Sequence, residues 1–177
     1  MRLFLELARR SFERHITYRA AALAGLATNI FFGLLRAAVM LALFGQAQQV
    51  SGFSVQDAVA YTGLTQASIA YLSLFGWYDL MRSIYTGEVS STLLKPVSFF
   101  FFWLSQDLGR AAAQVVLRGL PVILFYALYF GIPYPRSLIQ WSSLGLVLLL
   151  SELVSFTFRF LVNLAAFWTP NAIGIGG

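Results

Sequence analysis

The sequence contains no cysteine and only one histidine, His15. Disulfides, thiolate metal sites and thiol redox chemistry are therefore excluded, and the chain alone cannot assemble a histidine-based triad or a multi-histidine metal site. No GxxxxGK[ST] phosphate loop is present, and the glycine-rich run at residues 174–177 lacks the lysine that such a loop requires. We therefore expect no catalytic residue, cofactor or metal in this chain, and any nucleotide must bind another subunit.

Charged residues are scarce as well. They make up 11% of the chain, against 59% hydrophobic residues and a mean hydropathy of +0.74, whereas soluble domains carry about 25% charged residues. Several apolar runs exceed the ~20 residues that a helix needs to span a bilayer. The composition therefore predicts an all-α integral membrane protein. A pI near 9.9 would indicate nucleic-acid binding in a soluble protein, but here we expect the lipid bilayer, and no nucleic acid, as a partner.

Residues 1–15 are expected to form an amphipathic helix that lies in the headgroup plane. Its apolar face comprises Met1, Phe4, Leu5, Ala8 and Phe12. A secretory signal peptide is the alternative. The acids Glu6 and Glu13 among the bases, and the lack of a small-residue cleavage site, argue against that alternative.

Four transmembrane helices should follow within a single domain that covers residues 1–177. They are placed at residues 18–44, 55–78, 111–130 and 138–168, joined by short loops and by a longer loop over residues 79–110. Small side chains form a ridge along the first span, at Ala21, Gly25, Asn29, Gly33 and Ala37. Such a ridge allows another helix to approach closely, because packing drives helix association in lipid.

The second expected span is unusually polar for a helix in lipid. Thr62, Gln66 and Ser73 are expected to share one face and are candidate path-lining residues. Two interpretations remain open, because these side chains would serve either a translocation path or simple hydrogen bonding between helices. Ser54 is expected to cap this span, with Asp57 in its first turn.

The basic residues are distributed unequally between the two sides of the membrane. One side carries Arg2, Arg9, Arg10, Arg14, Arg19, Arg82, Lys95 and Arg110, whereas the loops of the other side carry only Arg136. Lysine and arginine accumulate in cytoplasmic loops. This asymmetry predicts a cytosolic N-terminus and a cytosolic loop over residues 79–110.

Ionisable residues are also expected at membrane depth, at Arg36, Arg118, Glu152 and Arg159. Unpaired charge is costly there, so these side chains should face inward and pair or reach the headgroups. Their depths along the spans make Arg118 and Glu152 the preferred pair, while Asp107 and Arg110 are expected to pair locally. For Glu152, a structural ion pair is favoured over a proton relay.

Within the cytosolic loop, residues 86–96 look shaped to contact a partner. A helix breaker and small capping residues precede Leu93 and Leu94, which would supply an apolar contact. Glu88 and Lys95 would add charges that fix the register of that contact. An ordinary connection between two helices is the alternative.

Five stretches carry a family resemblance. They are LELARRSFERHITYRAAALAGLATNIFFGLLRA (5–37), TGEVSSTLLKPV (86–97), WLSQDLGRA (103–111), LRGLP (117–121) and FRFLVNLAAFW (158–168). Through them the chain resembles the membrane subunits of type-2 ABC exporters, the ABC-2 permease family, and in particular a bacterial branch of short permeases.

The resemblance implies an interfacial connecting helix, six spans, a dimeric pore and a cytosolic coupling helix that docks on a separate ATPase subunit. The connecting helix maps to residues 1–15 and the coupling segment to residues 86–96. Against this pattern, the chain looks truncated after the fourth of six spans. The implied location is the bacterial cytoplasmic (inner) membrane, with several spans and a cytosolic N-terminus.

The sequence thus predicts a non-catalytic permease subunit of an ATP-driven ABC exporter. It would form the translocation path with a second permease subunit, identical or different, while ATP binds the partner ATPase subunit. Two alternatives are a non-transporting assembly or anchoring protein of the membrane, and a proton-coupled carrier that uses Glu152. The polar face of the second span suits many amphipathic molecules, so the pattern selects no single substrate.

Overall fold

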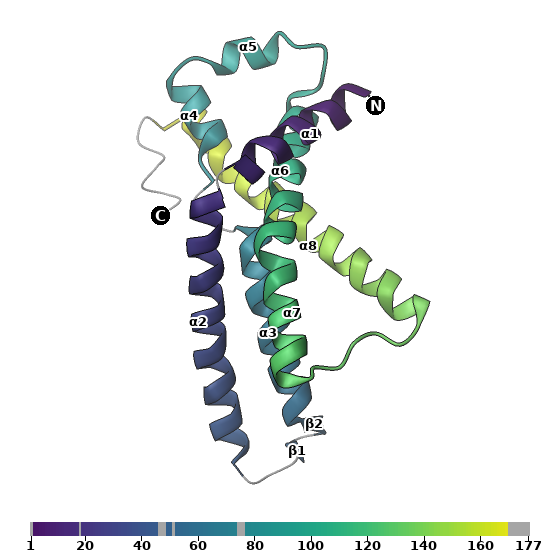
Figure 1. Cartoon of the computed structure of the whole chain (residues 1–177). Helices are drawn as coiled ribbons and strands as arrows, with labels where there is room; N and C mark the ends of the chain where they lie inside the picture. Colours follow the sequence, from purple (N-terminus) through teal and green to yellow (C-terminus); the bar gives the residue numbers. More distant parts are fainter. Residues whose placement is uncertain (1, 18, 46–48, 51, 74–76, 170–177) are drawn as a thin grey trace.

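The computed structural model describes residues 2–17, 19–45, 49–50, 52–73 and 77–169. The elements are α1 (Arg2–Thr17), α2 (Arg19–Phe44), β1 (Gln49–Val50), β2 (Phe53–Ser54), α3 (Val55–Leu72), α4 (Asp79–Tyr85), α5 (Val89–Leu93), α6 (Phe99–Gln114), the π-helical turn η1 (Val115–Gly119), α7 (Leu120–Phe130), α8 (Leu138–Leu164) and the 3₁₀ turn η2 (Ala165–Phe167). Apart from one short β1–β2 hairpin, the regular structure in these ranges is helical (Figure 1). The predicted all-α membrane fold is confirmed.

Within the described ranges, three helices are long and apolar enough to cross a membrane: Ala20–Phe44, Phe99–Phe130 and Leu138–Phe167. The second is one continuous helix made of α6, η1 and α7. It begins at Phe99 because the Ser98 hydroxyl accepts a hydrogen bond from the Phe101 N–H and caps the helix. The prediction that residues 79–110 form a loop is therefore wrong over 99–110, and α4 and α5 lie in the remainder.

The helix α3 occupies the second predicted span but is shorter and more polar than the other three. It begins with the expected cap: the Ser54 hydroxyl accepts from the Asp57 N–H at 3.2 Å, and the Asp57 carboxylate accepts from the Ser54 N–H at 3.0 Å. It ends at Leu72, followed by Ser73 in the left-handed conformation with φ of 46°. The predicted span to residue 78 is therefore too long.

The helices α2, α3 and α7 pack side by side (Figure 1). Two glycines of the small-residue ridge lie where neighbouring side chains press on α2. A Cβ atom on Gly25 would lie 2.7 Å from Arg118 Cζ, and one on Gly33 would lie 2.6 Å from the Tyr126 hydroxyl oxygen. Ala37 of the same ridge is fully buried. The ridge therefore serves close helix packing, as predicted.

The helix α1 lies across α6 at the end of the molecule that carries the N-terminus (Figure 1). Its outer face carries two one-turn ion pairs, with Arg10 Nε 3.0 Å from Glu6 Oε1 and Arg9 Nε 2.9 Å from Glu13 Oε1. Its inner face is fixed by a hydrogen bond of 2.6 Å from the Ser11 hydroxyl to a backbone carbonyl of α6. This amphipathic helix is therefore attached to the third span rather than resting on lipid alone.

An aromatic core lies where α4, α6 and α8 meet. It is built from Trp77, Leu80, Phe102, Trp103, Leu104, Phe156 and Phe160. The Trp77 and Trp103 rings meet edge to face with centroids 5.9 Å apart. Within the aromatic run at residues 99–103, Phe102 and Trp103 are buried inside the protein. The helix α4 is anchored in this core through Leu80, and Ile84 packs against it.

The helix α8 is covered over only part of its length. Its second half is buried at Glu152, Ser155, Phe156, Arg159, Phe160 and Asn163. Its first half leans away from α7 (Figure 1), and Leu138 and Ile139 are 84% and 77% exposed. The first half of α8 therefore presents an apolar surface that the described residues leave open.

Candidate functional site

The short helix α5 presents two leucines outward at one end of the molecule. Val89 and Thr92 are buried and hold the inner side of α5 against the protein. Leu93 is 58% exposed and Leu94 is 87% exposed. Both side chains are therefore exposed, and we call these two residues the leucine pair; their contact with a partner stays a prediction.

Local hydrogen bonds fix the shape of this segment. Gly87 has a φ of 77°, a left-handed conformation that glycine adopts without strain, and it redirects the chain between α4 and α5. The Ser90 hydroxyl donates to the Gly87 carbonyl and the Ser91 hydroxyl to the Glu88 carbonyl, both at 2.8 Å. Glu88 is exposed at the start of α5. The segment is thus a formed helix with a defined outer face before any partner binds.

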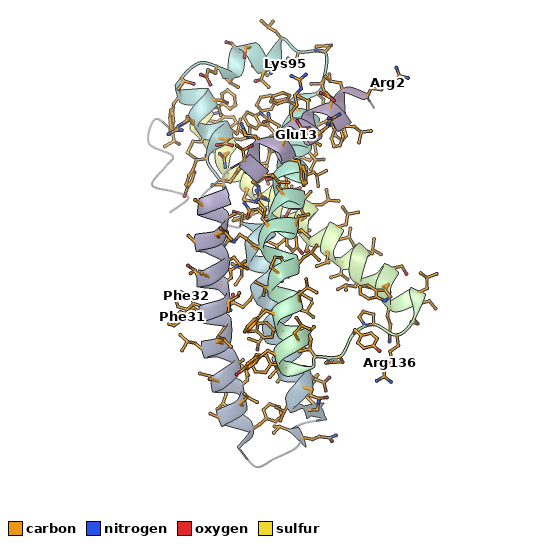
Figure 2. The ribbon with its side chains drawn as sticks, viewed as in Figure 1. Arg2, Glu13, Phe31, Phe32, Lys95 and Arg136 are labelled. Carbon is orange, nitrogen blue, oxygen red and sulfur yellow. The ribbon has the colours of Figure 1, made fainter. Side chains whose placement is uncertain are left out.

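Lys95 is exposed but turns back toward the protein. Its ammonium nitrogen lies 4.2 Å from the centroid of the Phe102 ring on α6, a cation–π distance. Figure 2 shows Lys95 at the same end of the molecule as Arg2 and Glu13, with Arg136 far from them. Lys95 therefore flanks the leucine pair and also ties the end of α5 to α6.

A cavity of about 360 Å³ lies under α5, between α1, α4 and α6. Its charged lining residues are Arg14, Asp79, Arg82, Glu88 and Lys95. Arg14 of α1 reaches to 3.9 Å from the Asp79 carboxylate at the start of α4. The interfacial helix and the α4–α5 segment therefore share one polar surface.

Four charged side chains form a cluster beneath the aromatic core, which we call the charge cluster: Asp107, Arg110, Glu152 and Arg159. Asp107 accepts from Arg110 Nε at 2.7 Å and from the two terminal nitrogens of Arg159 at 2.8 and 2.9 Å. Glu152 Oε1 accepts from Arg110 at 3.2 Å and from Arg159 at 3.1 Å. All four are at least 93% buried. Two acidic side chains thus meet two guanidinium groups in the interior.

The preferred pairing of Arg118 with Glu152 is wrong. Arg118 lies on the turn η1 and donates to the Gly25 carbonyl at 3.2 Å and to the Asn29 side-chain oxygen at 3.1 Å. Glu152 instead meets Arg110 and Arg159, and the local pair of Asp107 with Arg110 is confirmed. The pairing was predicted from the depths of Arg118 and Glu152 along their spans. The helix α6 instead begins at Phe99, so it also carries Asp107 and Arg110 into the interior, where Arg110 reaches Glu152.

Hydrogen bonds extend the charge cluster to the ends of α3 and α4. Arg110 donates to the Tyr71 carbonyl at 2.9 Å, and Ser155 donates to the Leu72 carbonyl at 2.7 Å. Asn163 accepts from the Met81 N–H at 3.0 Å and donates to a backbone carbonyl just before α4. The end of α3, the start of α4, and the helices α6 and α8 are therefore joined by directional polar contacts.

The candidate path-lining residues do not form one exposed face. Thr62 and Gln66 are each 3% exposed, and Thr62 donates its hydroxyl to the Ala58 carbonyl. Ser73 follows the end of α3 and so leaves that helical face. Thr62 also lines a groove between α2 and α3 that contains Arg36. A path-lining role for these residues stays a prediction.

The sequence did not predict that Asp107 and Arg110 belong to a buried cluster. They were predicted as a local pair before the third span, because their helix was expected to begin at residue 111. The signal was present in Ser98, a good N-cap residue placed just before an aromatic run. A helix started there carries both charges inward.

Comparison with known proteins gives one match. Residues 29–175 match the family model described as ABC-2 family transporter protein. Neither the curated proteins nor the solved structures contain a match to this chain.

Proposed function

Because this multi-pass membrane chain belongs to the ABC-2 family of transporter proteins, we propose that it is a permease subunit that couples to a separate ATPase subunit and exports its substrate. ATP binds and is hydrolysed on the partner, and this chain contributes no catalytic residue or cofactor. A second permease subunit completes the translocation path.

The observation that carries this proposal is the outward-facing leucine pair on a helix whose inner side is anchored. Exposed apolar side chains on a formed element mark a contact surface. Such small contacts concentrate their energy in a few buried anchors. Leu93 and Leu94 fit that role, and the adjoining charges Glu88 and Lys95 set the register of the partner.

Force applied at α5 has a physical route to the spans. The helix α5 connects to α4, whose Met81 N–H is held by Asn163 of α8. The same region of α8 is held to α6 by Arg159 and Asp107. Rigid packed elements move as units rather than deform continuously. A shift of α5 driven by the ATPase would therefore reorient α6 and α8 together.

The proposed orientation places α1, α4 and α5 in the cytosol of a bacterial cell, at its cytoplasmic membrane. The basic residues of the chain gather mainly at this end, and Arg136 lies on the opposite loop (Figure 2). This distribution supports the orientation through the excess of positive charge in cytoplasmic loops. It also puts the leucine pair on the side where ATP is available.

The charge cluster favours an ion-pair role for Glu152 over proton transport. Glu152 lies within hydrogen-bond distance of two arginines, so its side chain is already engaged inside the protein. A proton carrier would need Glu152 to gain and lose a proton while both arginines stay buried. The carrier alternative therefore has less support than coupling to an ATPase.

The test uses Leu93→Asp and Leu94→Asp in the full-length protein expressed with its ATPase. Each change buries an unpaired charge in the docking contact, so ATPase recovery on the purified permease should fall by at least ~tenfold. Substrate-stimulated hydrolysis should fall with it, whereas membrane abundance should be unchanged. Lys95→Ala should weaken docking less and mainly alter its salt dependence.

Ser90→Asp, compared with Ser90→Ala, provides the matched control. Ser90 is exposed on the same helix; both changes remove its hydroxyl bond to the Gly87 carbonyl, only the first adds a charge, and neither removes an apolar anchor. Both variants should retain the ATPase at close to the parent level. Retention of the ATPase by both leucine variants would refute coupling through α5, and recovery of no ATPase with the parent protein would favour the anchoring alternative.

A further inference from the structure

A groove between α2 and α3 combines apolar walls with one charged side chain. Its volume is about 430 Å³. It is lined by Phe32, Leu35, Arg36, Val39, Met40, Tyr61, Thr62 and Thr65. A second cavity of about 400 Å³ shares Met40 and Tyr61 with it and reaches the β1–β2 hairpin. The two cavities therefore adjoin each other at Met40 and Tyr61.

Arg36 is exposed in this groove, and its charge also acts on the buried Tyr126 hydroxyl of α7. No residue in the described ranges forms a hydrogen bond or ion pair with its guanidinium. Arg36 lies two turns before the end of α2 at Phe44, or about 12 Å at ~1.5 Å per residue. A charged side chain on an apolar helix is costly in lipid, so it pairs, extends to the headgroups or belongs to a functional site. Arg36 has no ion pair within the described residues, and its place in the groove favours a binding role.

The acids of the chain are engaged elsewhere. Asp57 lines the adjoining cavity, but its carboxylate accepts from the Ser54 N–H at 3.0 Å and from the Ser54 hydroxyl at 2.7 Å. Asp107 and Glu152 belong to the charge cluster. The other described acids lie on α1, at the start of α4 or just before α5, at the opposite end of α2 (Figure 1). Within the described residues, no acidic side chain compensates the positive charge of Arg36.

The remaining polar groups of the groove refine the chemistry. The Thr62 and Thr65 hydroxyls donate to the Ala58 and Thr62 carbonyls, both at 2.9 Å. Their hydrogens are therefore already used. Tyr61 is 68% exposed, and its hydroxyl and the Arg36 guanidinium remain as hydrogen-bond donors. A guanidinium pairs best with carboxylate or phosphate.

We propose that the groove between α2 and α3 binds the anionic head of an amphipathic substrate at Arg36, with its apolar chain along Phe32, Leu35 and Val39. This assignment rests on the proposed transport function. Within that function the occupant is the transported substrate, because the groove lies along the apolar helix Ala20–Phe44 of a transporter-family chain. The substrate class is therefore a lipid-soluble carboxylate or phosphate.

The test uses the permease in complex with its ATPase, reconstituted in phosphatidylcholine nanodiscs. Val39→Cys introduces a single cysteine into the groove of this cysteine-free chain, and an environment-sensitive fluorophore is attached there. Dodecyl phosphate and uncharged dodecanol are then titrated. The same fluorophore at Leu128→Cys, an 88% exposed position of α7, corrects for partition into the disc.

After that correction, dodecyl phosphate should half-saturate the signal at about tenfold lower concentration than dodecanol, or about 1.4 kcal/mol. Arg36→Gln should abolish the preference, and Arg36→Lys, which keeps the charge, should retain most of it. The matched control Arg136→Gln removes an exposed arginine outside the groove and should leave the preference intact. An equal response to both probes, or a preference that survives Arg36→Gln, would overturn the proposal.

Two further measurements distinguish a lipid headgroup from a substrate, and failure of the groove proposal from failure of the transport proposal. If phosphatidylglycerol in the disc gives the Arg36-dependent signal and blocks dodecyl phosphate, the occupant is a lipid and the substrate assignment is refuted. If the ATPase is retained but no anion preference is found, the groove proposal fails and the transport proposal stands. If the preference is found with a permease that recruits no ATPase, the transport proposal fails while the anion site stands.

Discussion

Asp107→Asn would test the charge cluster at its most connected member. The Asp107 carboxylate is 1% exposed and receives three hydrogen bonds of 2.7 to 2.9 Å from Arg110 and Arg159. Asparagine keeps the shape of the side chain but removes its charge. Two buried guanidinium groups would then share Glu152 as their only carboxylate in the cluster.

The expected cost follows from this imbalance. Removing one partner of a buried ion pair costs roughly 3–5 kcal/mol, which for a chain of this size lowers the Tm by on the order of 10 °C. The control is Asp79→Asn, because the contact of Asp79 with Arg14 is long, at 3.9 Å, and its side chain is 57% exposed. Exposed pairs contribute only about 0–1 kcal/mol, so the control should move the Tm little.

The assay is thermal unfolding in one fixed detergent, read from the folded peak in size-exclusion chromatography. A second substitution then identifies the partner. Arg159→Met in the Asp107→Asn background restores charge balance and should recover part of the lost Tm, whereas Arg118→Met should recover none. Equal shifts for Asp107→Asn and Asp79→Asn, or recovery by Arg118→Met, would refute the arrangement described here.

Two further predictions concern helix docking and topology. Gly109→Ala should lower the Tm by several degrees, because its new methyl group would collide with the α1 backbone at Ala8 and overpacking costs about 1–3 kcal/mol. The control is Gly145→Ala, whose added Cβ meets no neighbour within 4 Å. Equal Tm values for the two variants would exclude tight docking of α1. Cysteines introduced singly by Gln48→Cys and Ser90→Cys should react from opposite sides of the membrane, and labelling of Ser90→Cys by an impermeant reagent on intact cells would contradict a cytosolic α5.

Composition and local patterning were sufficient to predict the membrane environment, the fold class and most helix positions. A chain this apolar and this poor in charge must satisfy its backbone hydrogen bonds within helices in lipid. Local signals also identified the Ser54 cap and the small residues of α2, because each depends on residues within a few turns. The leucine pair was predicted as a surface for the same reason, since the glycine and small polar residues before it define a short helix. The predicted length of α3 was less accurate, because its polar residues face protein and the helix lacks the continuous apolar pattern of a lipid-exposed span.

Only the tertiary structure decided which charges meet. Glu152 has several arginines at plausible depths, and depth along separate helices cannot distinguish them; the crossing of α6 and α8 places Arg110 and Arg159 beside it and leaves Arg118 against Gly25. The exposure of Arg36 is likewise a property of packing, because it depends on which faces of α2 the neighbouring helices cover. Side chains distant in sequence acquire partners through the angles and offsets between helices, and those angles follow from the whole packed interface rather than from any single segment.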